Sequence, residues 1–181
     1  MKTTSRLSAV LLIAALMLTL CVPALAADAE YPTTAAFLKV MDEEEFTYDI
    51  LGIDDNGYER VETTFTGDYM DEIVVTILFD EDLDAVSMRS WDIIVFDDAD
   101  LSDVLMTVNQ LNNDYKFIKF TVDLTDNTVS AEMDFPIREG EDSAECVYDG
   151  LYYTVCVVDE GFLELQEYDV SGSNLAGAKK K

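Results

Sequence analysis

Carboxylates are the residues of this sequence that could do chemistry. The chain of 181 residues contains 38 Asp and Glu and no His. Paired carboxylates hydrolyse glycosides when one of them acts as a general acid with a raised pKa. No acidic pair here lies in an apolar stretch that would raise its pKa. The lack of His excludes Ser–His and Cys–His nucleophiles. We therefore expect no enzyme and no catalytic residues, and keep a carboxylate hydrolase as a third hypothesis.

The acidic stretch DEDLDA has the spacing with which an EF-hand calcium loop begins. Asp80, Asp82 and Asp84 occupy its alternate positions. Ala85 stands where the loop needs Gly, and Trp91 stands where it needs a bidentate Glu. The sequence thus predicts an acidic turn and no cofactor. Weak calcium binding through these three aspartates is the second hypothesis.

Three further residues are candidates for contacting a partner. Trp91 is the only tryptophan of the chain, and an exposed tryptophan can anchor a partner. A core position is more typical of so large an aromatic residue. Asn109 and Asn112 lie in the stretch VNQLNNDYKFIKFTVDL, where a helical pattern changes into alternation. Because Asn tolerates the left-handed turn that ends a helix, we interpret them first as a junction and second as a binding site.

Apolar residues at helical spacing predict three helices, at residues 33–45, 100–112 and 141–159. Thr33 and Thr34 can cap the first helix and Asp100 the second. Gly161 is expected to kink or break the third helix.

Alternating apolar and polar residues predict five strands, at residues 58–66, 71–80, 85–96, 116–124 and 128–135. Their short connections favour antiparallel pairing. With the helices, the expected order is α-β-β-β-α-β-β-α. The predicted fold class is α+β, an antiparallel five-stranded sheet with helices packed mainly on one face.

The two cysteines beyond the N-terminal segment are expected to be free thiols. Cys146 and Cys156 are ten positions apart in a predicted helix, which separates them by about 15 Å. A disulfide needs Cα atoms within about 7 Å of each other.

The N-terminus has the pattern of a secretory signal peptide. Lys2 and Arg6 precede the apolar stretch LSAVLLIAALMLTLCV, and small residues allow cleavage after Ala26. We expect a signal peptide at residues 1–26, a single domain at 27–170 and a flexible basic tail at 171–181. The protein is then secreted or extracytoplasmic. A retained membrane anchor is the alternative.

The net charge of −27 limits the partners. Nucleic acids and anionic lipids are polyanions, so neither is expected as a partner. The charge favours cationic partners or divalent cations, or serves only to keep an acidic surface solvated.

The stretch DVLMTVNQLNNDYKFIKFTVDLTDNTVSAEMDF resembles the YbjN domain, a family of bacterial sensory transduction regulators. In that family a helix ending in an N-x-x-N-like segment, here Asn109 and Asn112, precedes a hairpin and a final helix. The resemblance covers about residues 34–165. It implies a fold similar to type III secretion chaperones, often dimeric, and no catalytic residues. The signal peptide departs from the cytoplasmic roles of such relatives.

The leading functional hypothesis is a secreted, non-catalytic binding or chaperone-like module. It would hold a peptide or protein partner, and a homodimer is a further expectation. After cleavage of the signal peptide, no membrane contact is expected.

Overall fold

The computed structural model describes residues 29–82, 84–138 and 143–172. The predicted signal peptide and nearly all of the predicted basic tail lie outside these ranges. The described chain runs in the order α2, β1, β2, β3, β4, η1, α3, β5, β6, α4, η2. The fold is α+β, as the sequence predicts.

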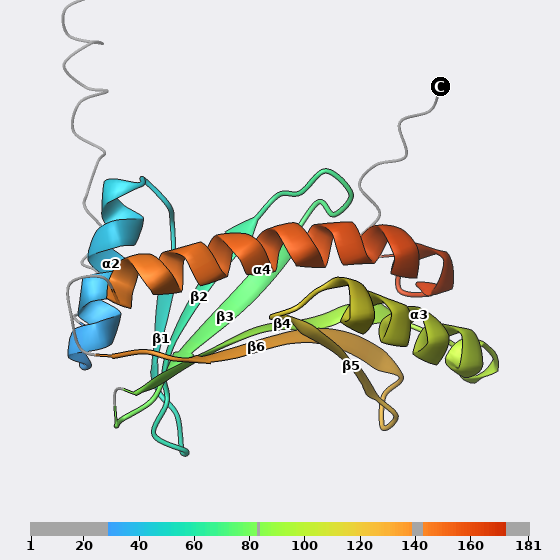
Figure 1. The fold of residues 1–181 in the computed structure, drawn as a ribbon, viewed down its shortest axis with the longest axis horizontal. Helices are drawn as coiled ribbons and strands as arrows, with labels where there is room; N and C mark the ends of the chain where they lie inside the picture. The colour runs from blue at the N-terminus through green and yellow to red at the C-terminus, as the bar shows by residue number, and fades with distance from the viewer. Residues whose placement is uncertain (1–28, 83, 139–142, 173–181) are drawn as a thin grey trace, which may run out of the picture.

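The sheet has six antiparallel strands, in the spatial order β1-β2-β3-β4-β6-β5 (Figure 1). Their bounds are Asp49–Ile53, Glu59–Phe65, Ile73–Phe79, Ala85–Val95, Lys119–Asp123 and Thr128–Pro136 for β1 to β6. The prediction of five strands is therefore wrong, because it omits β1. That strand is short, lies at an edge of the sheet, and shifts register between Ile50 and Gly52. The shift interrupts the alternation by which a strand is identified in a sequence.

Three α-helices are described, and they lie close to their predicted positions. They are α2 (Pro32–Glu43), α3 (Leu101–Asp114) and α4 (Ser143–Leu165), and the short 3-10 helices η1 (Asp98–Asp100) and η2 (Gln166–Tyr168) precede α3 and follow α4. The long helix α4 crosses one face of the sheet, with α2 at its start and α3 beside β5 (Figure 1). None of the described helices covers the opposite face of β4, β5 and β6.

The core lies between α4 and the sheet. Met88, Phe79 and Phe162 are fully buried there, and the rings of Phe37 and Phe79 lie 5.6 Å apart. Burying each such side chain stabilises the fold by about 1.5–3 kcal/mol.

Helix α4 continues through Gly161 without the break that the sequence suggests. A Cβ atom at this position would collide with the ring of Phe120, which is itself buried. Gly161 is therefore a point where the helix approaches β5 closely, and the prediction of a kink or break is wrong.

The predicted capping by side chains is not formed. The N-cap of α2 is Tyr31, and the buried hydroxyls of Thr33 and Thr34 have no hydrogen-bond partner. The buried carboxylate of Glu59 instead accepts the N–H groups of Glu30 and Tyr31, at 2.7 and 2.9 Å. At α3, Asp100 occupies the N-cap position as predicted, but its side chain makes no capping hydrogen bond.

A second buried carboxylate fixes the β2–β3 connection. Asp159, in the C-terminal half of α4, accepts the N–H groups of Asp68, Tyr69 and Met70 at 2.7, 3.0 and 2.9 Å. Gly67 lies against the same carboxylate, where a Cβ atom would collide with it. Three charge-assisted hydrogen bonds thus join the loop to the helix.

Within the described ranges, no helix is both long enough and apolar enough to cross a membrane.

Candidate functional site

Trp91 lies on the surface of the sheet. Its side chain is 55% exposed, so the expectation of a core position is wrong. The pairing of β4 with β6 shifts register between Ser90 and Ile94, and Asp92 within this bulge has φ of 51°. The Asp92 N–H donates to Ser130 Oγ at 3.1 Å. The bulge thereby presents Trp91 and Asp92 to solvent, as bulges beside functional sites commonly do.

Trp91 forms part of a groove of about 480 Å³ on the face of β4, β5 and β6 that none of the described helices covers. This sheet-face groove is lined by Trp91, Asp92, Thr121, Val122, Asp123, Leu124, Asp126, Thr128, Ser130 and Glu132. Leu124 is 64% exposed, and with Trp91 and Val122 it supplies the apolar part of the groove. The groove combines an apolar surface with four carboxylates.

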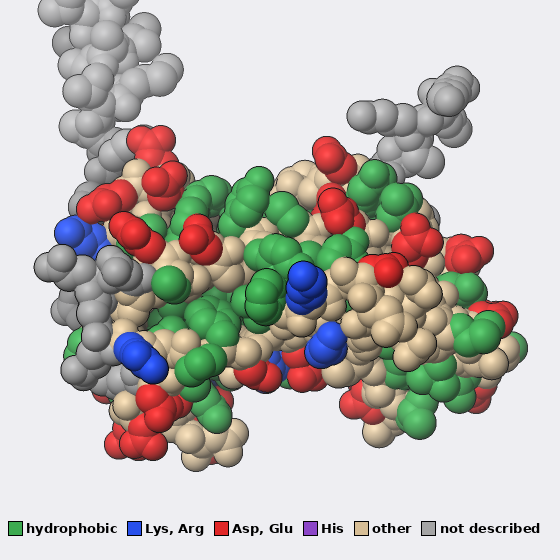
Figure 2. Space-filling model, viewed as in Figure 1, with side chains coloured by type: hydrophobic (Ala, Val, Ile, Leu, Met, Phe, Trp, Pro, Cys, Tyr) green, Lys and Arg blue, Asp and Glu red, His purple; other side chains and the backbone are tan. Residues whose placement is uncertain are grey.

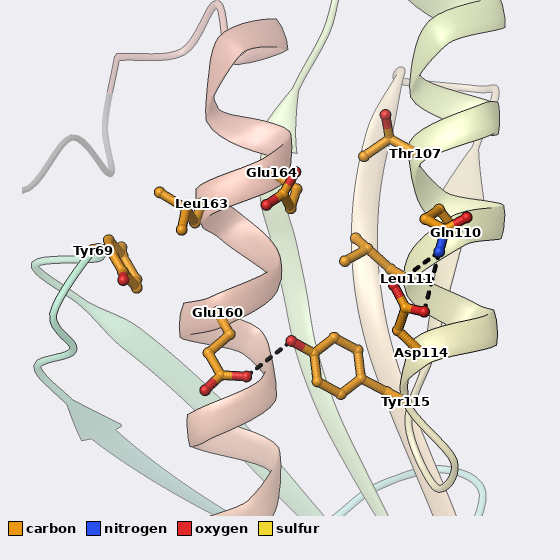
Figure 3. A pocket seen from close by; sticks show the side chains of 9 residues that line it. All are labelled: Tyr69, Thr107, Gln110, Leu111, Asp114, Tyr115, Glu160, Leu163 and Glu164. Carbon is orange, nitrogen blue, oxygen red and sulfur yellow. Dashed lines mark hydrogen bonds between the residues drawn. The ribbon is translucent and has the colours of Figure 1, made fainter.

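A second groove, of about 500 Å³, lies between α3 and α4 (Figure 3). In this helix groove, Tyr115 and Glu160 point toward each other, and the Tyr115 hydroxyl donates to Glu160 Oε2 at 2.9 Å (Figure 3). Burial, the hydrogen bond to Glu160 and its negative charge raise the pKa of Tyr115 to about 12. Gln110 donates to both carboxylate oxygens of Asp114, each at 3.0 Å.

These contacts give the helix groove a structural role. Glu160 and Asp114 both act as hydrogen-bond acceptors, whereas the general acid of a glycoside hydrolase must donate a proton. The Tyr115–Glu160 bond joins the end of α3 to α4. The carboxylate hydrolase hypothesis stays a prediction, and no contact in this groove favours it.

The three aspartates of the predicted calcium loop form the turn between β3 and β4. Asp80 Oδ1 accepts the N–H of Asp84 at 3.1 Å. Hydrogen bonding to Asp80, followed by the charge of Asp80, raises the pKa of Asp84. Among the described residues, no group of three acidic or cysteine side chains is placed to hold a metal ion. Calcium binding by Asp80, Asp82 and Asp84 stays a prediction.

The two candidate asparagines occupy different environments. The side-chain amide of Asn112 forms two hydrogen bonds with the backbone of Phe120. Its Oδ1 accepts the N–H at 2.7 Å and its Nδ2 donates to the carbonyl at 2.9 Å. Asn109 is exposed on α3. The structure brings neither residue to Trp91. Asn112 thus links α3 to β5, but α3 continues to Asp114 and Asn112 does not adopt the left-handed turn on which the junction interpretation rested.

The outer surface of α4 exposes apolar side chains. Figure 2 shows hydrophobic side chains gathered along this helix, with acidic ones around them. Tyr152 is 66% exposed, and the exposed ring of Phe117 meets Tyr153 edge-on with centroids 5.9 Å apart. Cys146 and Cys156 lie in the same helix and are free thiols, as their spacing predicts.

The carboxylates and Leu124 of the sheet-face groove were not expected as site residues. The alternation of β5 and β6 could have placed Asp123, Ser130 and Glu132 on one face. Only the bulge at Asp92 brings Trp91 to them, and no sequence pattern signals it.

The described residues therefore define an α+β protein with one sheet face covered by helices and an acidic, tryptophan-bearing groove on the other. The chain belongs to the YbjN family, whose description is "Putative bacterial sensory transduction regulator" and whose profile matches residues 34–147. The crystal structure of YbjN from E. coli, described as "a putative transcription regulator", has a similar fold. Its TM-score is 0.56 at 7% sequence identity, with 80% of this chain and 95% of that chain covered. No curated protein matches this chain.

Proposed function

We propose that this protein is a secreted or extracytoplasmic, non-catalytic binding module that holds a peptide or protein partner, in the manner of a chaperone. The sheet-face groove is the binding site. The observation that carries the proposal is the exposure of Trp91 and Leu124 in one groove on an uncovered sheet face. Exposed aromatic and apolar side chains in a concave polar surface are typical of partner contacts.

Two features support the non-catalytic and extracytoplasmic parts of this proposal. The chain has no His, which removes the commonest general base and nucleophile activator. Its N-terminal apolar segment has the pattern of a signal peptide. The family description as a regulator is compatible with a role in protein interaction.

Site-specific photo-crosslinking in the native host tests this function. A photoreactive amino acid replaces Leu124, which lines the groove. This substitution leaves Trp91 in place. The matched control places it at Asn109, which is exposed on α3. We expect a discrete adduct with another protein at position 124, none at 109, and loss of the adduct on Trp91→Ala.

Two outcomes contradict this assignment. Equal adducts at both positions would mean that contact is not specific to the groove. An adduct of the protein with itself would show that the groove is an interface of the expected homodimer. Cell fractionation of the same samples tests the location, and recovery of the full-length chain in the cytoplasm would contradict it.

A further inference from the structure

The sheet-face groove is acidic on three strands. Asp92 comes from the β4 bulge, Asp123 from β5 and Glu132 from β6, while Asp126 lies in the turn between β5 and β6. Three of these carboxylates have one oxygen engaged locally: Asp123 accepts the N–H of Thr125, Asp126 the hydroxyl of Thr128, and Glu132 the hydroxyl of Thr121. These bonds hold the carboxylates in place and leave further acceptor positions on each.

Two basic residues flank one side of the groove, because Arg89 and Lys119 are both cross-strand partners of Glu132. Arg89 of β4 pairs with Asp134 at 2.7 Å. Lys119 of β5 directs its Nζ to the carbonyl of Asn112 at 3.1 Å. Neither residue lines the groove. The carboxylates of Asp92, Asp123 and Asp126 therefore lie in the groove with the exposed Trp91, and no basic residue is among the lining residues.

An indole beside carboxylates is a recognition surface for organic cations. A Lys or Arg side chain gains from the quadrupole of the ring as well as from the carboxylates, and its aliphatic stem packs on apolar side chains such as Leu124. A small metal ion fits less well. Among the described residues no three carboxylates converge on one point, whereas a long side chain can contact groups that lie apart.

We propose that the sheet-face groove binds a lysine or arginine side chain within an extended segment of the partner protein. This inference rests on the proposed function and names the chemistry of the partner at the same groove. Charge complementarity selects the occupant, because the groove carries four carboxylates and no basic residue.

Dye-labelled hexalysine and hexaarginine serve as probes, with an uncharged Ser/Asn hexapeptide as the comparison. Binding to the purified protein is measured by fluorescence anisotropy at low and at physiological salt. We expect both cationic peptides to bind, the uncharged peptide to bind at least tenfold more weakly, and Trp91→Ala to weaken cationic binding by about tenfold, within the range of desolvated cation–π contacts. Circular dichroism confirms that each variant is folded.

A matched pair of double variants separates the groove from the overall charge. Asp92→Asn/Asp123→Asn removes two charges inside the groove. Asp71→Asn/Glu72→Gln removes two exposed charges before β3. We expect the groove variant to weaken binding at least fivefold and the control to change it less than twofold. Equal losses would show that the peptides follow net charge, which overturns the inference.

The remaining outcomes distinguish the inference from the function on which it rests. Tighter binding of the uncharged peptide, still dependent on Trp91, would overturn the cationic partner and leave the binding module standing. Absence of binding by either cationic peptide would overturn the inference, while the crosslinking experiment decides the function independently.

A chain that ends at Gly172 lacks three lysines. If only this shortened chain binds the cationic peptides, the groove is occupied by the protein's own C-terminal lysines. That result would overturn the assignment of a partner segment as the occupant.

Discussion

The side-chain amide of Asn112 pairs with the backbone of Phe120 as a neighbouring strand would. Its Oδ1 accepts the Phe120 N–H at 2.7 Å and its Nδ2 donates to the Phe120 carbonyl at 2.9 Å. β5 is one of the two edge strands of the sheet. The N–H and carbonyl groups of Phe120 point away from β6, and the side chain of Asn112 on α3 satisfies both. Asn112 therefore covers a part of the sheet edge that could otherwise pair with another strand.

Asn112→Ala should lower the free energy of unfolding by about 1–3 kcal/mol, since it leaves a backbone donor and a backbone acceptor without partners. Asn109→Ala, three positions earlier on an exposed part of the same helix, should be neutral or slightly stabilising, because Ala has the higher helix propensity. Denaturant unfolding measures both. Similar effects for the two substitutions would contradict the pairing role, and increased aggregation of only the Asn112 variant would support protection of the edge.

Asp159→Ala should destabilise the fold by about 2–4 kcal/mol, because three N–H groups of the β2–β3 loop lose a charged acceptor. Glu164→Ala, on the exposed side of the same helix, is the control and should change stability by less than about 0.5 kcal/mol. Thermal unfolding provides the comparison. Hydrogen exchange at Asp68–Met70 should accelerate in the Asp159 variant, and unchanged exchange there would contradict the assignment.

Gly161→Ala should be destabilising by about 1–3 kcal/mol, although alanine normally favours a helix, because its Cβ would overlap the ring of Phe120. Gly150→Ala in the same helix meets the ring of Phe135 at 3.1 Å, a milder contact. The gain in helix propensity, about 1 kcal/mol, should largely offset that contact. Equal melting temperatures of the two variants would contradict this ranking.

The tyrosinate of Tyr115 should form only at strongly alkaline pH. Burial, then the hydrogen bond to Glu160, raises its pKa from about 10 to about 12. The folded state thus prefers the neutral phenol, and the resulting stabilisation is complete below pH 10 and is lost as the pH rises through 12. In a pH titration followed by ultraviolet absorbance, Tyr115→Phe should lack one tyrosine that ionises at the alkaline end of the titration. Loss of a tyrosine that ionises near pH 10 would contradict the contact with Glu160.

Quenching of Trp91 fluorescence should depend on the charge of the quencher. The residue is the only tryptophan, is exposed, and lies among carboxylates. Relative to its quenching of free tryptophan, caesium should therefore be more effective on Trp91 than iodide is, with a difference that shrinks at high salt. Asp92→Asn/Asp123→Asn should reduce the difference, and Asp71→Asn/Glu72→Gln should preserve it. A red-shifted emission is also expected, and a blue-shifted, poorly quenched emission would place the indole in the core.

The periodic elements of this fold could be predicted from the sequence, because α3, α4 and β2 to β6 each bury one face against a common core. β1 could not, since Gly52 adopts a left-handed φ of 78° at a register shift and the strand has only one neighbour. Gly161 was misinterpreted because its role depends on Phe120, which lies 41 positions earlier in the chain.

The site was less predictable than the fold. The strand containing Trp91 is apolar on both faces near its end, which is typical of a buried strand. Its exposure comes from a bulge that depends on the pairing of β4 with β6. The role of Asn112 as a junction was predictable, because Asn at a helix end commonly bonds nearby backbone. The residue that it contacts was not.

The link between Asp159 and the β2–β3 loop also has a consequence for the order of folding. The three amides that this carboxylate holds precede it by 89 to 91 positions. A ribosome releases the N-terminal part of a chain first. The amides of the β2–β3 loop therefore remain hydrogen-bonded to water until nearly the whole domain has been synthesised and α4 has packed on the sheet. A chain truncated before Asp159 should therefore leave these three amides exposed to solvent and this loop accessible to proteases.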